Sequence, residues 1–222
     1  MANLRERKFA RTRISLYEAL VVRLQEHSFE HISVRDLSED VQVSEGTFFN
    51  YFPEKSDLLL YSMQIWGVLV TLRLRDLRSA SCLEKVLSVF ELTVLEMEKH
   101  PRLLFEVISL FARADFLRPV SLTQHERGQI FSHNPLAENS SPAHPGSIFT
   151  TIALEAKARR EIPEHADPEG LALGLEALFY GLIVSAKSRG TDHLKKVYRK
   201  QVDMFWTGGS QWLGGIHRPG ES

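Results

Sequence analysis

The sequence has one cysteine, Cys82, among its 222 residues. A single thiol excludes a disulfide within the chain and a zinc site built from several cysteines, and such usage is typical of a reducing compartment. The basic N-terminal stretch MANLRERKFARTR has no apolar segment of a secretory signal, and no uninterrupted apolar run reaches the length of a membrane span. We therefore predict a cytoplasmic, soluble protein with no membrane partner, in which Cys82 is a small core residue.

Patterns of catalysis and metal binding are also scarce. There is no glycine-rich phosphate loop and no serine nucleophile elbow, and the nine histidines lack the close repeated spacing of metal ligands. Four carboxylates crowd one helix junction, where we interpret them as helix caps and solvated charges: Glu161, Glu164, Asp167 and Glu169. We predict a protein that is not an enzyme and holds neither metal nor cofactor.

Charge of one sign does not dominate the chain, since the formal net charge is −1. The position of the charges therefore matters more than their sum. Basic residues cluster near the N-terminus, whereas residues 14–55 carry more carboxylates than basic groups. The cluster consists of Arg5, Arg7, Lys8, Arg11 and Arg13. It is either a solvated tail or an arm that contacts a polyanion.

What the sequence does contain is a series of helix signals close to the N-terminus. Apolar residues at steps of three and four predict a first helix over about 8–26, with one buried stripe. The stripe consists of Ile14, Tyr17, Leu20, Val21 and Leu24. A second helix begins after Ser33, which forms a capping-box pattern with Asp36, and its predicted buried face contains Val34, Leu37 and Val41.

The same signature recurs at Ser44, with Val43 before the cap and Phe48 four residues after it. Two short helices joined by a turn form a helix-turn-helix, here over about 33–52. Phe48 and Phe52 share the core side of the second of these helices. The other side presents Glu45, Gly46, Thr47, Phe49, Asn50 and Tyr51. Aromatic and small polar residues on one exposed face favour docking into a DNA groove.

The stretch VSEGTFFNYFPEKSDLL resembles the N-terminal domain of TetR-type transcriptional regulators. The matching positions are Val43, Ser44, Gly46, Thr47, Phe48, Phe49, Tyr51, Phe52, Lys55 and Leu58. The resemblance implies that Ser33 and Lys55 lie near phosphate and that Thr47, Phe49 and Tyr51 face DNA. Glu45 and Asn50 are our candidates for base specificity. The sequence departs from the family at Ser28 and Gln42, where glycine is common.

The remainder of the chain is predicted to be helical almost throughout, which gives an all-α fold. We expect a three-helix DNA-binding domain over 10–70, a larger ligand-binding and dimerisation domain over 71–207, and a loosely held tail over 208–222. The stretch 134–146, rich in proline, serine and asparagine, is predicted to be a loop. Asp167 and Pro168 start a long helix, and the last helix is expected over about 191–206.

The resemblance also implies a ligand cavity among the central helices and a dimer. Candidate ligand residues are Trp66, Phe90, Phe105, Phe111, Phe116 and Phe149, with Arg113 and His125 as polar contacts. For the aromatic residues, the alternative is ordinary core packing. Small residues along one face of the helix after Pro168 are candidates for the dimer interface, with packing inside one chain as the alternative: Gly174, Ala177, Gly181 and Ser185.

We therefore expect a homodimeric transcriptional repressor that binds a palindromic operator in double-stranded DNA and is released by a small apolar molecule. Two other classes stay open at this point. One is a helical interaction module that does not bind DNA, which the acidic balance of residues 14–55 favours. The other is a small-molecule enzyme in the helical domain, for which the sequence offers no motif of its own.

Overall fold

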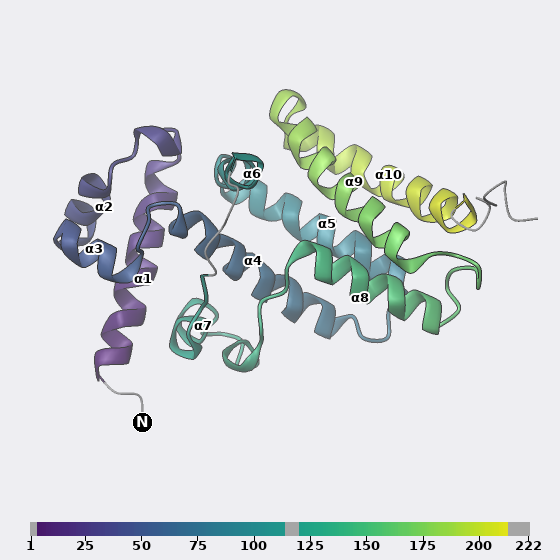
Figure 1. Cartoon of the computed structure of the whole chain (residues 1–222), viewed down its shortest axis with the longest axis horizontal. Helices are drawn as coiled ribbons and strands as arrows, with labels where there is room; N and C mark the ends of the chain where they lie inside the picture. The colour runs from purple at the N-terminus through teal and green to yellow at the C-terminus, as the bar shows by residue number, and fades with distance from the viewer. Residues whose placement is uncertain (1–3, 114–119, 213–222) are drawn as a thin grey trace, which may run out of the picture. The chain divides into compact units, whose positions relative to one another are not determined.

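The chain folds into helices throughout the part that the structure describes (Figure 1). The structure is a computed structural model that describes residues 4–113 and 120–212, with side chains up to Gly208. No strand occurs in these two ranges, and the predicted all-α fold is confirmed. The helices are α1 (Leu4–Arg23), η1 (Phe29–His31), α2 (Val34–Val41), α3 (Glu45–Tyr51), α4 (Asp57–Asp76), α5 (Cys82–Lys99), α6 (Leu103–Arg113), α7 (Gln124–Ile130), η2 (Ala137–Asn139), α8 (Pro145–Ala158), α9 (Pro168–Arg189) and α10 (Thr191–Trp212).

The predicted helix starts are set by local capping. The backbone N–H of Asp36 donates to the Ser33 hydroxyl, and the Ser33 N–H donates to the Asp36 carboxylate, both at 3.0 Å. The Thr47 N–H donates to Ser44 Oγ at 3.1 Å. Asp167 accepts from two backbone N–H groups at the start of α9. Each cap supplies acceptors for N–H groups that the helix leaves unpaired.

Two helix ends differ from the prediction. α1 begins at Leu4, so the basic residues of the N-terminal cluster lie on a helix and do not form a loose arm. α10 continues to Trp212, beyond the expected end near residue 206, and it takes in the first residues of the predicted tail. The rest of that tail, residues 213–222, lies outside the described residues.

The turn between α2 and α3 contains a residue in the left-handed conformation that is not a glycine. Gln42 ends α2 with φ 57° and ψ 45°, a conformation that costs a residue with a side chain about 1 kcal/mol. Ser28 has φ −73° and ψ 154°, an ordinary extended conformation. Of the two departures from the family pattern, Gln42 therefore keeps the left-handed geometry and Ser28 has no strained backbone.

The described chain divides into two compact units. The first unit holds the residues up to Leu72 together with Glu96–Pro142, and the second holds Arg73–Leu95 together with the residues from Ala143 onward. α4 and α5 contribute residues to both. The predicted domain boundaries follow the chain in sequence order, whereas the first unit contains two separate segments.

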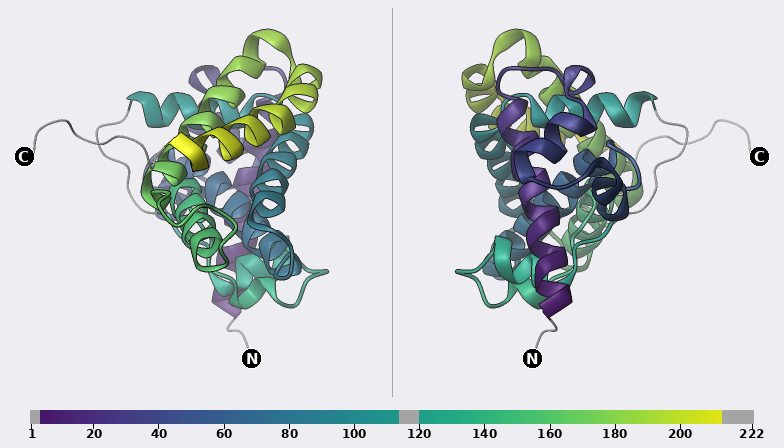
Figure 2. Two further views of the ribbon diagram at one scale, coloured as in Figure 1. Left: turned by 90° about the vertical axis from the view of Figure 1, so that its right-hand side faces the viewer. Right: turned by 90° about the vertical axis from the view of Figure 1, so that its left-hand side faces the viewer.

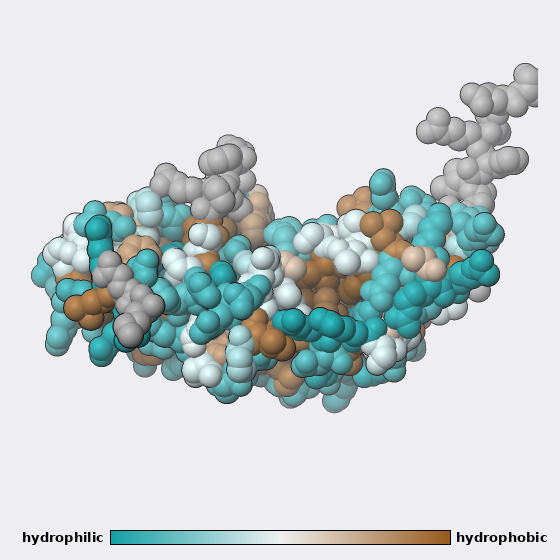
Figure 3. Space-filling view, turned by 90° about the horizontal axis from the view of Figure 1, so that it is seen from below, coloured by the Kyte–Doolittle hydropathy of each residue, from teal (hydrophilic) through white to brown (hydrophobic). Residues whose placement is uncertain are grey.

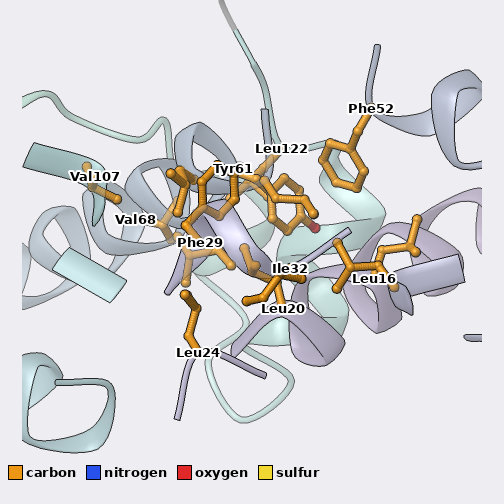
Figure 4. Packing of buried hydrophobic residues seen from close by; sticks show 14 of the residues in the cluster. Leu16, Leu20, Leu24, Phe29, Ile32, Phe52, Tyr61, Val68, Val107 and Leu122 are labelled. Atoms are coloured by element: carbon orange, nitrogen blue, oxygen red, sulfur yellow. The ribbon is translucent and has the colours of Figure 1, made fainter. Parts of the chain in front are cut away.

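The core of the first unit fills the space between α1, the helix-turn-helix and α4 (Figure 4). α2 and α3 pack against α1 (Figure 2, right). Phe48 and Phe52 are fully buried, as predicted. The predicted buried stripe of the first helix is confirmed at Leu20 and Leu24, whereas Ile14, Tyr17 and Val21 are only half-buried. The buried residues of α1 are Ala10, Arg13, Leu16 and Leu20, and Leu24 continues this stripe in the turn after the helix.

Arg13 is buried at the centre of that stripe. Its guanidinium lies 3.1 Å from Glu126 Oε1, and it also donates to the carbonyl of Ser121. Tyr61 donates its hydroxyl to the same Glu126 Oε1 at 2.9 Å. Burial and the charge of Glu126 raise the pKa of Tyr61, so the phenol keeps the proton that it donates. The network joins α1, α4 and α7.

The guanidinium carbon of Arg13 lies 4.8 Å from the centre of the Phe52 ring and 4.7 Å from that of Tyr61. A cation held against aromatic faces is attracted by the ring quadrupole. Phe52 is the residue that ends α3. The buried network therefore also contacts the end of the second helix of the helix-turn-helix.

In the second unit, α8 and α10 pack against α9 (Figure 1). Four buried rings meet in its core, with Phe90 at 5.4 Å from Phe179 and 6.0 Å from Phe149, and stacked on Tyr198. Lys85, 5% exposed, forms an ion pair with Glu155. Cys82 is fully buried, as predicted.

Two helices, α4 and α9, are long and apolar enough to cross a membrane by length and composition. This is weak evidence, since core helices of soluble proteins meet the same criterion and two thirds of the relevant window of α4 is buried inside the protein. On the face shown in Figure 3, hydrophobic residues lie in separate patches among hydrophilic ones. The sequence analysis considered only uninterrupted apolar runs, and for that reason it did not identify these two helices.

The buried ion pair gives a first prediction. Glu126→Gln should lower the free energy of unfolding by about 3 kcal/mol, because it leaves the Arg13 charge buried without a counterion. Urea unfolding followed by circular dichroism measures the change. The control is Arg113→Gln, which breaks the exposed pair between Arg113 and Glu30 and should change stability little. Equal losses in both variants would contradict the role given to Glu126.

Candidate nucleic-acid interface

α3 presents most of its predicted DNA-facing residues on one open face. Phe48 and Phe52 anchor the helix in the core, while Glu45, Gly46 and Asn50 are exposed. Phe49 is 47% exposed, which is unusual for a phenylalanine with no partner helix over it. At the start of the helix the Ser44 and Thr47 hydroxyls lie 2.8 Å apart. The structure thus brings the predicted residues of α3 together.

Gly46 is not required by packing inside the chain. A Cβ built at this position would meet only the Ser44 Oγ, at 3.9 Å, which is ordinary contact. Its backbone is helical, so no left-handed angle calls for glycine. Glycine in a helix is less favourable than alanine by about 1 kcal/mol. The residue therefore fits a surface that another molecule approaches closely.

Thr47 and Tyr51 are less exposed than predicted. Both are half-buried, and the Tyr51 ring lies 5.0 Å from the ring of Phe9 on α1. The contact holds the side chain of Tyr51 at the end of α3, and part of its ring surface packs against α1. This contact joins residues far apart in sequence, which is why the local pattern did not indicate it.

Lys55 has a structural role that the sequence analysis missed. Its ammonium group donates to the carbonyls of Phe29 and Ile32, both at 2.8 Å, and lies 4.3 Å from the centre of the Phe29 ring. Partial burial lowers the pKa of Lys55, opposed by the charges of Glu30 and Glu106. The side chain thus ties the start of α4 to η1, just before α2. Its predicted contact with phosphate stays a prediction.

The carboxylates of α2 are neutralised locally. Asp40 accepts from Arg23 Nη2 at 2.9 Å, and Glu39 accepts from Arg35 at 2.8 Å. Asp36 is engaged in the capping box with Ser33, which lowers its pKa. The acidic balance of residues 14–55 therefore does not amount to a free negative surface on this helix.

Basic residues of α1 border the turn of the helix-turn-helix. Arg7, Lys8 and Arg11 line a hollow together with Gln42 and Val43. None of these three cations forms an ion pair with another residue in the described ranges. Exposed cations without a counterion beside the turn of a helix-turn-helix are suited to contact with a phosphate backbone.

The predicted ligand residues are not gathered at one site. Phe90 and Phe149 pack with other rings in the core of the second unit. In the first unit Trp66 lines a small cavity, and Phe105 and Phe111 are half-buried. Arg113 is exposed and paired with Glu30, and His125 lies 3.1 Å from Glu6. Phe116 lies outside the described residues. Their assignment to one ligand site stays a prediction that this arrangement does not support.

The small residues of α9 face different environments. A Cβ on Gly174 would lie 2.0 Å from the Phe205 ring of α10, so this glycine serves packing within the chain. Gly181 has nothing within 4 Å of such a Cβ, and Ala177 is exposed. Ser185 is half-buried and donates to the Leu182 carbonyl. Leu173 and Val184, 69% and 52% exposed, extend the open part of this face.

These features define a helix-turn-helix protein of the DNA-binding class. Comparison with known families agrees, since residues 16–61 match the model described as bacterial regulatory proteins, tetR family. The matched segment contains the whole helix-turn-helix, so the N-terminal part of the chain is a DNA-binding domain of the TetR type. No curated protein matches the sequence.

Solved structures share the fold over nearly the whole chain. One, from work on the molecular basis for control of antibiotic production by bacterial hormones, is 17% identical, covers 89% of this chain and 96% of that chain, and has a TM-score of 0.60. Another, a protein of unknown function from Rhodococcus sp. RHA1, is 20% identical, with 90% and 96% covered and a TM-score of 0.59. At these identities the likeness establishes the fold alone.

The two roles of Lys55 can be separated experimentally. Lys55→Met should lower the free energy of unfolding by about 2 kcal/mol, because two carbonyl groups lose a charged donor. A lysine that contacted DNA alone would be nearly neutral for stability. Urea unfolding without DNA makes the distinction, with Lys8→Met as the matched control on an exposed lysine. Unchanged stability of Lys55→Met would show that its bonds to η1 contribute nothing.

Gly46 gives a prediction in which stability and binding change in opposite directions. Gly46→Ala should raise the free energy of unfolding by about 0.5 to 1 kcal/mol through helix propensity. It should weaken DNA binding, because the new methyl group occupies the surface that DNA approaches. Fluorescence anisotropy with a selected DNA site measures affinity.

The matched control is Gly208→Ala on α10, where a Cβ also meets open space. It should leave DNA affinity unchanged. If Gly46→Ala bound DNA as tightly as the unmodified protein, the close approach at this position would be wrong.

Proposed function

We propose that the protein is a ligand-responsive transcriptional repressor that acts in the cytoplasm and binds a palindromic operator as a homodimer. The outward face of α3 carries this proposal. Phe49 packs edge-on against Phe48 and still leaves 47% of its surface exposed, and Gly46 has no packing role within the first unit. A helix-turn-helix that made contacts only within its own chain would need neither the exposed phenylalanine nor the glycine.

In the proposed complex α3 enters the major groove. Glu45 and Asn50 contact base edges, where a carboxylate accepts from cytosine and an amide pairs with adenine. Phe49 contacts a thymine methyl group, and Thr47 and Tyr51 contact the backbone. Ser33, Ser44 and Lys55 lie near phosphates at the edges of the interface. Contacts with base edges set sequence preference, and contacts with the DNA backbone set affinity and register.

The exposed cations of α1 add a sequence-independent contribution. Each phosphate that a protein neutralises releases condensed counterions, so that affinity falls with salt. Arg7, Lys8 and Arg11 border the same turn as Gln42. Removing one of them should lower the salt slope by about one and weaken binding to all sequences alike.

The proposed dimer uses the open face of α9. Ala177 and Gly181 allow close helix approach, and Leu173 and Val184 supply exposed apolar surface. Gly174 is excluded from this face by its contact with Phe205. A two-fold dimer places two copies of α3 on half-sites roughly 34 to 36 Å apart, or a multiple of that spacing.

Release from DNA follows from a shift between two conformations. A small molecule acts as effector when it binds the DNA-incompetent state more tightly than the competent one, since equal affinity shifts nothing. We propose a small, largely apolar effector.

Selection of the purified protein on random double-stranded DNA at moderate salt tests the proposal, with the retained DNA sequenced. Enrichment of a two-fold symmetric site is expected. A site without symmetry would argue against the dimer. No enrichment at moderate or lower salt would overturn DNA binding and favour a helical interaction module.

The dimer face has its own test. Val184→Glu should shift the protein from dimer to monomer in sedimentation velocity, because it places a charge in an apolar contact. Leu154→Glu changes an exposed leucine on α8 and serves as the control that leaves the dimer intact. A dimer that persists unchanged in Val184→Glu would place the interface elsewhere.

A further inference from the structure

A hollow of about 220 Å³ lies between the end of α1 and the turn that joins α5 to α6, within the first unit. Its apolar wall contains Val21 of α1, Leu24 just after α1, and Leu103 of α6. Leu24 is 2% exposed and belongs to the core cluster shown in Figure 4. One wall of the hollow is therefore formed by a core residue, while its rim is made of more exposed side chains.

The charged residues around the hollow have one sign. These are Lys99 and Arg102, which line it together with His100, and no carboxylate lies among the lining residues. Lys99 is paired with Glu96 at 2.7 Å. Arg102 is exposed and has no ion pair or side-chain hydrogen bond among the described residues. A guanidinium beside an apolar recess is suited to two parallel hydrogen bonds with a carboxylate.

His100 provides an independent indication of a polar ligand. Its Nδ1 atom is buried and has no hydrogen-bond partner among the described residues. Buried polar atoms are nearly always paired, and an unpaired one in a native structure calls for an explanation. His100 also lines a second cavity of about 50 Å³, together with Trp66 and Met97. The imidazole therefore stands between two recesses.

We propose that this hollow binds a small apolar carboxylate, with the acid group at Arg102 and His100 and the apolar part against Val21, Leu24 and Leu103. A cavity of roughly 150 Å³ holds a benzene molecule, so the hollow has room for one ring, or a short aliphatic chain, together with its carboxylate.

The site is connected to the helix-turn-helix through α6. Glu106 of α6 accepts a hydrogen bond from the backbone N–H of Phe29 at 3.2 Å, and Arg113 of the same helix pairs with Glu30. Both partners belong to η1, which Lys55 holds from the other side. A ligand that moves Leu103, the first residue of α6, therefore acts on the segment before α2. This step alone rests on the proposed function.

Isothermal titration calorimetry on the full chain tests the binding site. Sodium benzoate and sodium hexanoate are compared with benzamide and hexanamide, which keep the shape and lose the charge. We expect the acids to bind at least tenfold more tightly than the amides, as charge-assisted hydrogen bonds to a ligand typically contribute that factor or more. Equal affinity of acids and amides, or binding of neither, would overturn the proposal.

Two variants locate the binding. Arg102→Gln should weaken binding of the acids about tenfold, whereas Arg75→Gln, at an exposed arginine of α4, should not. Val21→Phe fills the recess without removing charge and should abolish binding. Acid binding that survives both Arg102→Gln and Val21→Phe would place the ligand elsewhere and overturn this assignment.

Anisotropy of a labelled selected DNA site, with and without benzoate, separates this inference from the proposed function. If DNA binds and the acids do not bind, the ligand assignment is wrong and the repressor proposal stands. If the acids bind and the protein retains no DNA, the site is right and the repressor proposal fails. If both bind without affecting each other, the connection through α6 is wrong.

Discussion

The guanidinium of Arg13 is buried, and the structure of the first unit depends on how its charge is compensated. Glu126, fully buried, comes from α7, 113 residues further along the chain. Removing either partner would leave a charge in the core, a state that proteins avoid strongly. The pair therefore requires α1 and α7 to lie together. Because Phe52 packs against the same guanidinium, the end of α3 is positioned by this pair as well.

Much of the helix-turn-helix could be predicted from the sequence because its signals are local. Ser33 with Asp36, and Ser44 with Thr47, act within one helical turn, so their spacing alone indicates where α2 and α3 begin. The buried positions of Phe48 and Phe52 follow from helical periodicity. The left-handed conformation of Gln42 could not be predicted from the sequence, because a residue that is not glycine adopts such an angle only where the surrounding structure requires it.

What the sequence could not indicate are contacts between distant residues. Arg13 belongs to a run of basic residues and is indistinguishable from its exposed neighbours until Glu126 is placed beside it. Lys55 matches a phosphate-binding position, yet its ammonium group is already bonded to two carbonyls of the segment before α2. The aromatic residues proposed as one ligand site are spread over both units, because helical periodicity identifies buried faces and not which buried faces meet.

The two-segment composition of the first unit bears on how such proteins can be recombined. Leu122 and Phe131 contribute to the same core as the helix-turn-helix, and they are separated from it in sequence by the first segment of the second unit. A chimera that joined residues up to Leu72 to an unrelated sensor domain would lack this wall of its core and the counterion of Arg13. Exchange of DNA specificity between relatives is therefore easier through the face of α3 than through transfer of the N-terminal segment.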